Sequence, residues 1–201
     1  LERPVALKVL PAAFAGDADR LERFRREALT LASVNHPNIA TIHGIEPLPG
    51  GAIALVLEFV AGETLAARLA RGALPPEQAL AVGTTLAEAL EAAHEKGIVH
   101  RDLKPLNVMF GEHDRLKVLD FGLARRERDA DDDGVLGSPG YLSPEQAMGA
   151  PQDTRTDVFA FGCVLYECLA GTRAFPGEDL SMAGAAALYL EPDWTALPGG
   201  L

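Results

Sequence analysis

The sequence predicts an α+β fold in which a small sheet with one helix is followed by a mainly helical part. Three short runs rich in β-branched and apolar residues occur within the first 60 residues, and an amphipathic helical pattern lies between the first two. After Gly62 the apolar residues recur mostly at helical spacing. A chain of 201 residues with 48% hydrophobic and 23% charged residues can bury a core, which excludes intrinsic disorder.

The predicted sheet contains three strands. The first is expected at Val5–Leu10, where apolar and β-branched residues are followed by a proline. A helix follows it, and Asp17 or Asp19 can cap that helix. Two further strands, at Ile39–Gly44 and Ala52–Val60, flank a turn rich in Pro and Gly, which favours antiparallel pairing.

The helical part is predicted to begin with a long helix. Pro75 and Pro76 can start this helix, and Gly97 can end it. The later elements are two short strands and a further helix that Gly171 ends, predicted at Val108–Phe110, Leu116–Leu119 and about Thr156–Ala170.

The overall charge narrows the choice of partners. Eighteen Lys and Arg residues against 29 Asp and Glu residues give a net charge of −11. Such a chain repels phosphate backbones and anionic membrane surfaces, so we expect no nucleic-acid partner. No apolar run approaches the roughly 20 residues that span a bilayer, and no secretory leader is visible. We therefore expect a cytoplasmic domain, and leave open a membrane anchor outside this chain.

The two cysteines, Cys163 and Cys168, are five residues apart in a predicted helix. That spacing places them about 140° apart around the helix axis, so they cannot readily form a disulfide. We expect two buried thiols in a reducing compartment.

The chemistry is concentrated in two segments. HRDLKPLN, from His100 to Asn107, lies between the long helix and the next strand, and Asp120-Phe121-Gly122 begins thirteen residues later. A carboxylate, a lysine two residues on and an asparagine five residues on can bring a hydroxyl, a phosphate and a metal ion together. A second carboxylate after a strand can complete the oxygen ligands of that metal.

These segments resemble the eukaryotic-like protein kinases, and YLSPEQ is most similar to bacterial serine/threonine kinases. The resemblance covers nearly the whole chain and implies a two-lobed kinase-like fold. Residues 1–60 would form an incomplete N-lobe with one helix, and residues 61–201 an incomplete, mainly helical C-lobe. It also implies transfer of the γ-phosphoryl group of ATP, with Mg²⁺, to Ser or Thr hydroxyls of protein substrates.

The resemblance assigns the catalytic roles residue by residue. Asp102 matches the base that accepts the proton of the substrate hydroxyl, and Asn107 and Asp120 match the magnesium ligands. Lys104 would neutralise charge on the transferred phosphoryl group, and a lysine at this position indicates serine and threonine acceptors.

The resemblance also assigns the nucleotide-binding residues. Lys8 in VALK matches the lysine that grips the α- and β-phosphates, and Glu27 matches the helix glutamate that pairs with it. Leu57 would be the gatekeeper beside the adenine. The hinge, whose backbone would hydrogen-bond the base, would comprise Glu58, Phe59 and Val60.

Further matches are structural or regulatory. Ser138 stands where the family usually has a threonine that bridges the catalytic Asp and Lys, and it keeps the hydroxyl. Asp157 matches the aspartate that holds the backbone of the catalytic loop, and Glu145 belongs to the segment usually written APE. Arg101 and Arg125 match basic residues that receive a phosphate on the activation segment.

The activation segment departs from the family pattern, because no Ser, Thr or Tyr occurs between Gly122 and Ser138. One hypothesis is that the carboxylates of Asp129 and Asp131–Asp133 replace the phosphate. The alternative is a solvated acidic loop. Replacing Asp131–Asp133 by Asn in the full-length parent tests the hypothesis, since unchanged turnover would remove it.

The ends of the chain differ from the family as well. Only seven residues precede Lys8, so the glycine-rich loop is absent, and Glu145 is expected to lack the late arginine that pairs with it. We interpret the chain as a fragment of a kinase domain. A pseudokinase or regulatory ATP-binding module and a small-molecule phosphotransferase remain alternatives. Lys104, the SPE segment and DVFAFG argue against the phosphotransferase.

Overall fold

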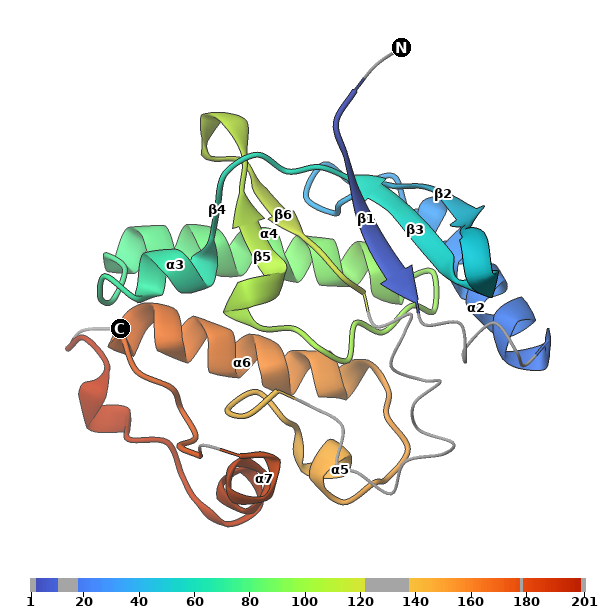
Figure 1. The fold of residues 1–201 in the computed structure, drawn as a ribbon. Helices are drawn as coiled ribbons and strands as arrows, with labels where there is room; N and C mark the ends of the chain where they lie inside the picture. The colour runs from blue at the N-terminus through green and yellow to red at the C-terminus, as the bar shows by residue number, and fades with distance from the viewer. Residues whose placement is uncertain (1–2, 11–17, 122–137, 178, 200–201) are drawn as a thin grey trace.

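The computed structural model describes residues 3–10, 18–121, 138–177 and 179–199. An antiparallel sheet with strand order β1-β3-β2 forms the N-terminal part, with helix α2 beside it (Figure 1). These elements are β1 Val5–Leu10, α2 Ala18–Ala32, β2 Ile42–Pro47, the 3-10 turn Pro49–Gly51 and β3 Ile53–Glu58. The predicted α+β class is confirmed.

The second strand lies later in the sequence than predicted, at Ile42–Pro47. The residues before it form backbone hydrogen bonds to another strand instead, because Val118 donates to the Asn38 carbonyl over 2.7 Å and Ala40 donates to the Val118 carbonyl over 2.9 Å. The predicted strand start at Ile39 was therefore wrong. Ile39 forms an isolated parallel bridge to Val118.

The remainder of the described chain is mainly helical and contains a second small sheet with the order β4-β5-β6. Its strands are β4 Glu63–Thr64, β5 Val108–Phe110 and β6 Leu116–Val118. Its helices are α3 Leu65–Leu69, α4 Pro76–His94, α5 Pro144–Ala147, α6 Thr154–Ala170 and α7 Leu180–Tyr189. Its 3-10 turns are Pro105–Asn107, Glu112–Asp114 and Trp194–Ala196.

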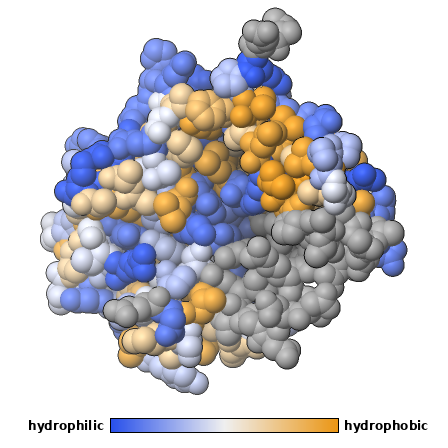
Figure 2. All heavy atoms as spheres, viewed as in Figure 1, coloured by the Kyte–Doolittle hydropathy of each residue, from blue (hydrophilic) through white to orange (hydrophobic). Residues whose placement is uncertain are grey.

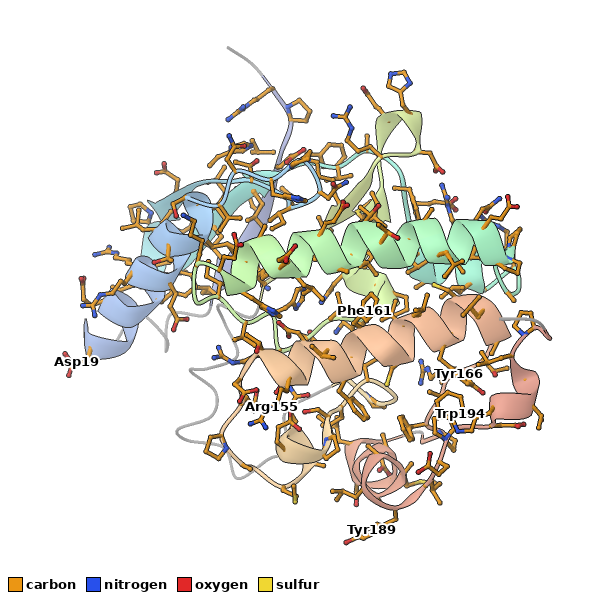
Figure 3. The ribbon with its side chains drawn as sticks, turned by 180° about the vertical axis from the view of Figure 1, so that it is seen from behind. Asp19, Arg155, Phe161, Tyr166, Tyr189 and Trp194 are labelled. Carbon is orange, nitrogen blue, oxygen red and sulfur yellow. The ribbon has the colours of Figure 1, made fainter. Side chains whose placement is uncertain are left out.

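Helices α4 and α6 pack lengthwise against each other and form the centre of the helical part (Figure 1). The buried residues of α4 form one apolar face of the helix: Ala79, Val82, Gly83, Leu86, Ala89, Leu90 and Ala93. The Asp153 carboxylate caps the start of α6, and Gly171 ends it in the left-handed region at φ 71°. Tyr166 on α6 and Trp194 in the last 3-10 turn pack edge to face, with ring centroids 6.2 Å apart (Figure 3).

Both cysteines are buried and free, as predicted. Burial raises the pKa of each thiol to about 12. Among the described residues, no helix combines the length and the apolar character needed to cross a bilayer. Arg125 and the acidic run at 129–133 lie outside the described residues.

Candidate active site

The segment between α4 and β5 carries the predicted catalytic residues. Lys104 Nζ lies 3.0 Å from Asp102 Oδ2 and donates a hydrogen bond of 2.7 Å to Ser138 Oγ. The Ser138 hydroxyl in turn donates to Asp102 Oδ1 over 2.9 Å. Each oxygen of the Asp102 carboxylate thus has a partner, so the carboxylate is fixed in orientation.

Asp157 at the start of α6 holds the backbone of this segment. Its side chain is 0% exposed and accepts hydrogen bonds from the N–H of His100 at 2.7 Å and the N–H of Arg101 at 2.8 Å. His94 Nε2, on α4, lies 2.7 Å from Asp157 Oδ2. Arg101 has a φ of 62°, a strained conformation for a side chain of this size. The hydrogen bonds from the N–H groups of His100 and Arg101 to Asp157 hold the backbone in this strained conformation.

His100 connects the catalytic segment to the strand before Asp120. Its Nδ1 accepts from the Asp102 N–H over 3.2 Å, and its Nε2 lies 2.9 Å from the Leu119 carbonyl oxygen. Burial lowers the pKa of His100 and outweighs the nearby Asp157 and Asp102 charges, so the ring is neutral with the proton on Nε2. Both nitrogens are occupied, which fits an orienting residue and leaves none free to act as a base.

Asn107 and Asp120 come together through the pairing of β5 with β6. The Leu119 N–H donates to the Asn107 carbonyl over 2.8 Å, and Val108 lies opposite Val118 in the register. The Asn107 amide nitrogen donates to the Asp102 carbonyl over 2.8 Å, which leaves its amide oxygen as a ligand. This oxygen and the Asp120 carboxylate form a set of hard oxygen donors, which suits Mg²⁺.

Lys8 reaches this group from the N-terminal sheet. Its Nζ lies 3.0 Å from Asp120 Oδ1. Lys8 sits opposite Leu55 in the pairing of β1 with β3, and the two strands form one wall of a cavity of about 320 Å³. Apolar residues of the N-terminal sheet, together with Leu119 and Phe121 just after β6, line the cavity beside Lys8, Glu58 and Asp120. In Figure 2 the apolar atoms of the sheet lie above a hydrophilic hollow.

The volume falls within the range of small-molecule sites. The cavity combines an apolar slot for a planar ring with a lysine and a carboxylate at its edge. The predicted gatekeeper Leu57 lines it as well. The arrangement suits a nucleotide whose base lies against the sheet and whose phosphates point to Lys8 and Asp120.

The predicted hinge follows β3 directly, because this strand ends at Glu58 and β4 begins at Glu63. Phe59 and Val60 belong to the connection between the two sheets. Burial would raise the pKa of Glu58, but hydrogen bonds from Lys117 and from the Thr41 N–H outweigh it and lower the pKa below its ordinary value. The Glu58 carboxylate is therefore ionised and anchored at neutral pH.

Other predicted residues lie apart from this group. Glu27 is half-buried on α2, and its pairing with Lys8 stays a prediction, since Lys8 forms an ion pair with Asp120. The Glu145 carboxylate accepts a hydrogen bond of 2.6 Å from Thr156 on α6. A hydroxyl within this chain thus supplies a partner for Glu145, and the expected absence of the late arginine stays a prediction.

Three residues near the site were missed in the sequence: His94, Lys117 and Gln146. Gln146 donates to the Arg101 carbonyl over 2.8 Å and forms a capping box with Ser143. That capping pattern, Ser143-Pro144-Glu145-Gln146, is a readable signal. His94 and Lys117 have partners more than fifty residues away in the chain, so no local pattern marks them.

In a comparison with protein families, the protein kinase domain matches residues 2–189 of this chain. The chain belongs to the protein kinase family. It is 42% identical over 186 residues to serine/threonine-protein kinase PknB of Mycobacterium leprae, a match that covers 89% of this chain and 30% of that protein. It is 46% identical over 186 residues to serine/threonine-protein kinase pkn2 of Myxococcus xanthus, covering 88% of this chain and 22% of that protein. The chain thus spans less than a third of these relatives.

Proposed function

We propose that this chain carries the catalytic part of a serine/threonine protein kinase that transfers the γ-phosphoryl group of ATP to a protein hydroxyl. The observation that carries the proposal is the hydrogen-bonded triangle of Asp102, Lys104 and Ser138, which contacts Asn107 through Asp102. The names of the relatives support a serine or threonine acceptor.

In the proposed reaction the acceptor hydroxyl oxygen attacks the γ-phosphorus and forms a new P–O bond. The bond from the γ-phosphorus to the bridging oxygen breaks, and ADP leaves with the electron pair. Asp102 accepts the hydroxyl proton, and Lys104, 3.0 Å from Asp102 Oδ2, places a positive charge beside the transferred group.

The nucleotide is held by residues of the N-terminal sheet, of the hinge and of the segments that flank β5 and β6. Lys8 binds phosphate oxygens, Leu57 lies beside the adenine, and the backbone of Glu58 and Val60 hydrogen-bonds the base. Asn107 and Asp120 would hold Mg²⁺, which neutralises charge on the phosphate oxygens when bound. With ATP present, Lys8 exchanges part of its contact with Asp120 for the phosphates.

The experiment is a transfer assay with γ-labelled ATP, Mg²⁺ and a generic protein substrate, run on the full chain. We expect label on serine and threonine, and a loss of about 10²- to 10⁴-fold in Asp102→Asn, because general base catalysis contributes about that much. Lys8→Met should weaken ATP binding.

Two results would overturn the proposal. Thermal stabilisation by ATP and Mg²⁺ without any transfer would indicate a nucleotide-binding module. Transfer to an aminoglycoside but not to protein would indicate a small-molecule phosphotransferase.

A further inference from the structure

Lys117 joins the two sheets of the molecule. It lies on β6 of the second sheet, and its Nζ is 2.8 Å from the carboxylate of Glu58, the last residue of β3 in the N-terminal sheet. The side chains of Lys117 and Glu58 are only 15% and 28% exposed. A charge-assisted contact that is this sheltered from water is stronger than an ordinary surface ion pair.

Backbone hydrogen bonds surround the ion pair and fix the Glu58 carboxylate. The Thr41 N–H donates to Glu58 Oε2 over 3.0 Å, and the Glu58 N–H donates to the Thr41 carbonyl over 2.8 Å. The residues just before Thr41 are themselves hydrogen-bonded to β6: the side-chain amide of Asn38 donates to the Leu116 carbonyl over 2.8 Å. A closed ring of contacts therefore runs from β3 through residues 38–41 to β6 and returns through Lys117.

This ring holds the two halves of the proposed nucleotide site in register. Glu58 is followed directly by Phe59 and Val60, the backbone proposed to meet the adenine. Lys117 precedes Asp120, at the phosphate end of the site, by only three residues. Glu58 lines the 320 Å³ cavity, whereas Lys117 is not among the residues that line it. Of this ion pair, Glu58 is therefore the member that meets the cavity.

We propose that Lys117 is a positioning residue for nucleotide binding, which holds Glu58 so that the hinge backbone is preorganised for the adenine. The proposal rests on the proposed function, since it takes the hinge as the adenine site. Loss of the Lys117 charge would leave the Glu58 carboxylate held by the Thr41 N–H alone and lower the fraction of molecules whose hinge is ready to bind. Affinity falls by that same fraction.

The position of Lys117 predicts which part of the ligand is affected. A cation that touched the phosphates would strengthen binding of ATP and leave adenosine unchanged. A residue that acts through the hinge must affect both ligands equally, because both contain the base. Adenosine and ATP therefore distinguish the two roles.

The test measures dissociation constants for adenosine and for ATP with Mg²⁺ in the full chain. For Lys117→Met we expect both constants to rise about 10-fold, with kcat at saturating ATP within about twofold of wild type and KM for ATP raised. Lys117→Arg keeps the cation and should stay within about twofold. The matched control is Arg155→Met, which removes a cation from an exposed ion pair with Asp153.

Glu58→Gln provides a second route, should Lys117→Met fail to fold. It should raise the dissociation constants of both ligands about as much as Lys117→Met does. The double variant should bind both ligands no more weakly than either single variant, because the two side chains act as one pair. Additive losses would overturn the proposal.

Other results would also overturn the role of Lys117 or the proposed function. Weaker ATP binding with unchanged adenosine binding, a lower kcat at unchanged KM, or tighter binding of either ligand would overturn the role of Lys117. Wild-type protein that binds adenosine and ATP but transfers no phosphoryl group would overturn the proposed function alone, because the binding measurements still test Lys117. Wild-type protein that binds neither ligand would overturn both.

Discussion

Ser138 donates a hydrogen bond of 2.9 Å to Asp102, across a gap of 36 residues in the chain. The same hydroxyl accepts from Lys104 over 2.7 Å, so one oxygen connects the proposed base with the proposed phosphate-neutralising cation. Serine supplies this contact as well as the threonine usual in the family, because only the hydroxyl takes part.

Removing the Ser138 hydroxyl is therefore expected to reduce turnover. In Ser138→Ala, Asp102 and Lys104 lose their common partner, and we expect kcat to fall about 10- to 100-fold, or about 1.4 to 2.7 kcal/mol of transition-state stabilisation. Ser138→Thr keeps the hydroxyl and should stay within about threefold of wild type. Steady-state kinetics with a protein substrate measure both, and an Ala variant as active as the Thr variant would contradict the role.

Asp157 is expected to contribute strongly to stability. Its replacement by Ala leaves the N–H groups of His100 and Arg101 without their acceptor, and an unsatisfied buried donor costs about 1 to 3 kcal/mol. We expect Asp157→Ala to lower the free energy of unfolding by about 3 kcal/mol or more, measured by denaturant titration. Glu88→Ala, an exposed carboxylate on α4, is the control and should change it by less than about 0.5 kcal/mol. Equal losses in the two variants would refute this account of Asp157.

The parts of the fold that could be predicted are those with a strong local pattern. β1 is a compact apolar run, and α4 and α6 have stop signals at glycines with positive φ, Gly97 and Gly171. Helix α7 was missed because nearly all its residues are apolar or small, so it has no helical stripe, although the Asp179 carboxylate caps its start.

The candidate site was predicted only as far as its motifs reach. The cluster of Asp102, Lys104 and Asn107 lies within six consecutive residues, so its composition is readable in the sequence. The pairing of Glu58 with Lys117 spans 59 residues and depends on how residues 38–41 align with β6. Single-sequence patterns carry no information on that alignment, which tertiary packing decides.

The two cysteines are expected to be unreactive in the native protein. Burial raises the pKa of both thiols to about 12, so at pH 8 only about one thiol in 10⁴ is ionised, and reagents cannot reach it. We expect reaction with Ellman's reagent to be at least about 100-fold faster in guanidinium chloride.

Met148→Cys places a thiol at a position that is 63% exposed and serves as the accessible control. This added thiol should react at once in the native state while Cys163 and Cys168 do not. Prompt native reaction of more than the added thiol would show that the helix carrying the two cysteines is open to solvent.

Stability is expected to fall as the pH drops below about 6.5, because of His100. Burial lowers the pKa of this ring below 6.5 in the folded state, so between the folded and unfolded pKa values the unfolded chain binds more protons. The free energy of unfolding then decreases with falling pH, by at most about 1.4 kcal/mol per pH unit for one group. The carboxylates of Glu63 and Asp153, with pKa values lowered to about 2, lose their contributions only at much lower pH. Denaturant titrations at pH 7.5 and 5.5 should show a smaller pH dependence of the free energy of unfolding in His100→Phe than in wild type.

His113→Asn is the control, at an exposed turn with φ 56° that asparagine tolerates, and it should keep the full pH dependence of the wild type. Equal slopes in wild type and His100→Phe would place the titrating group elsewhere.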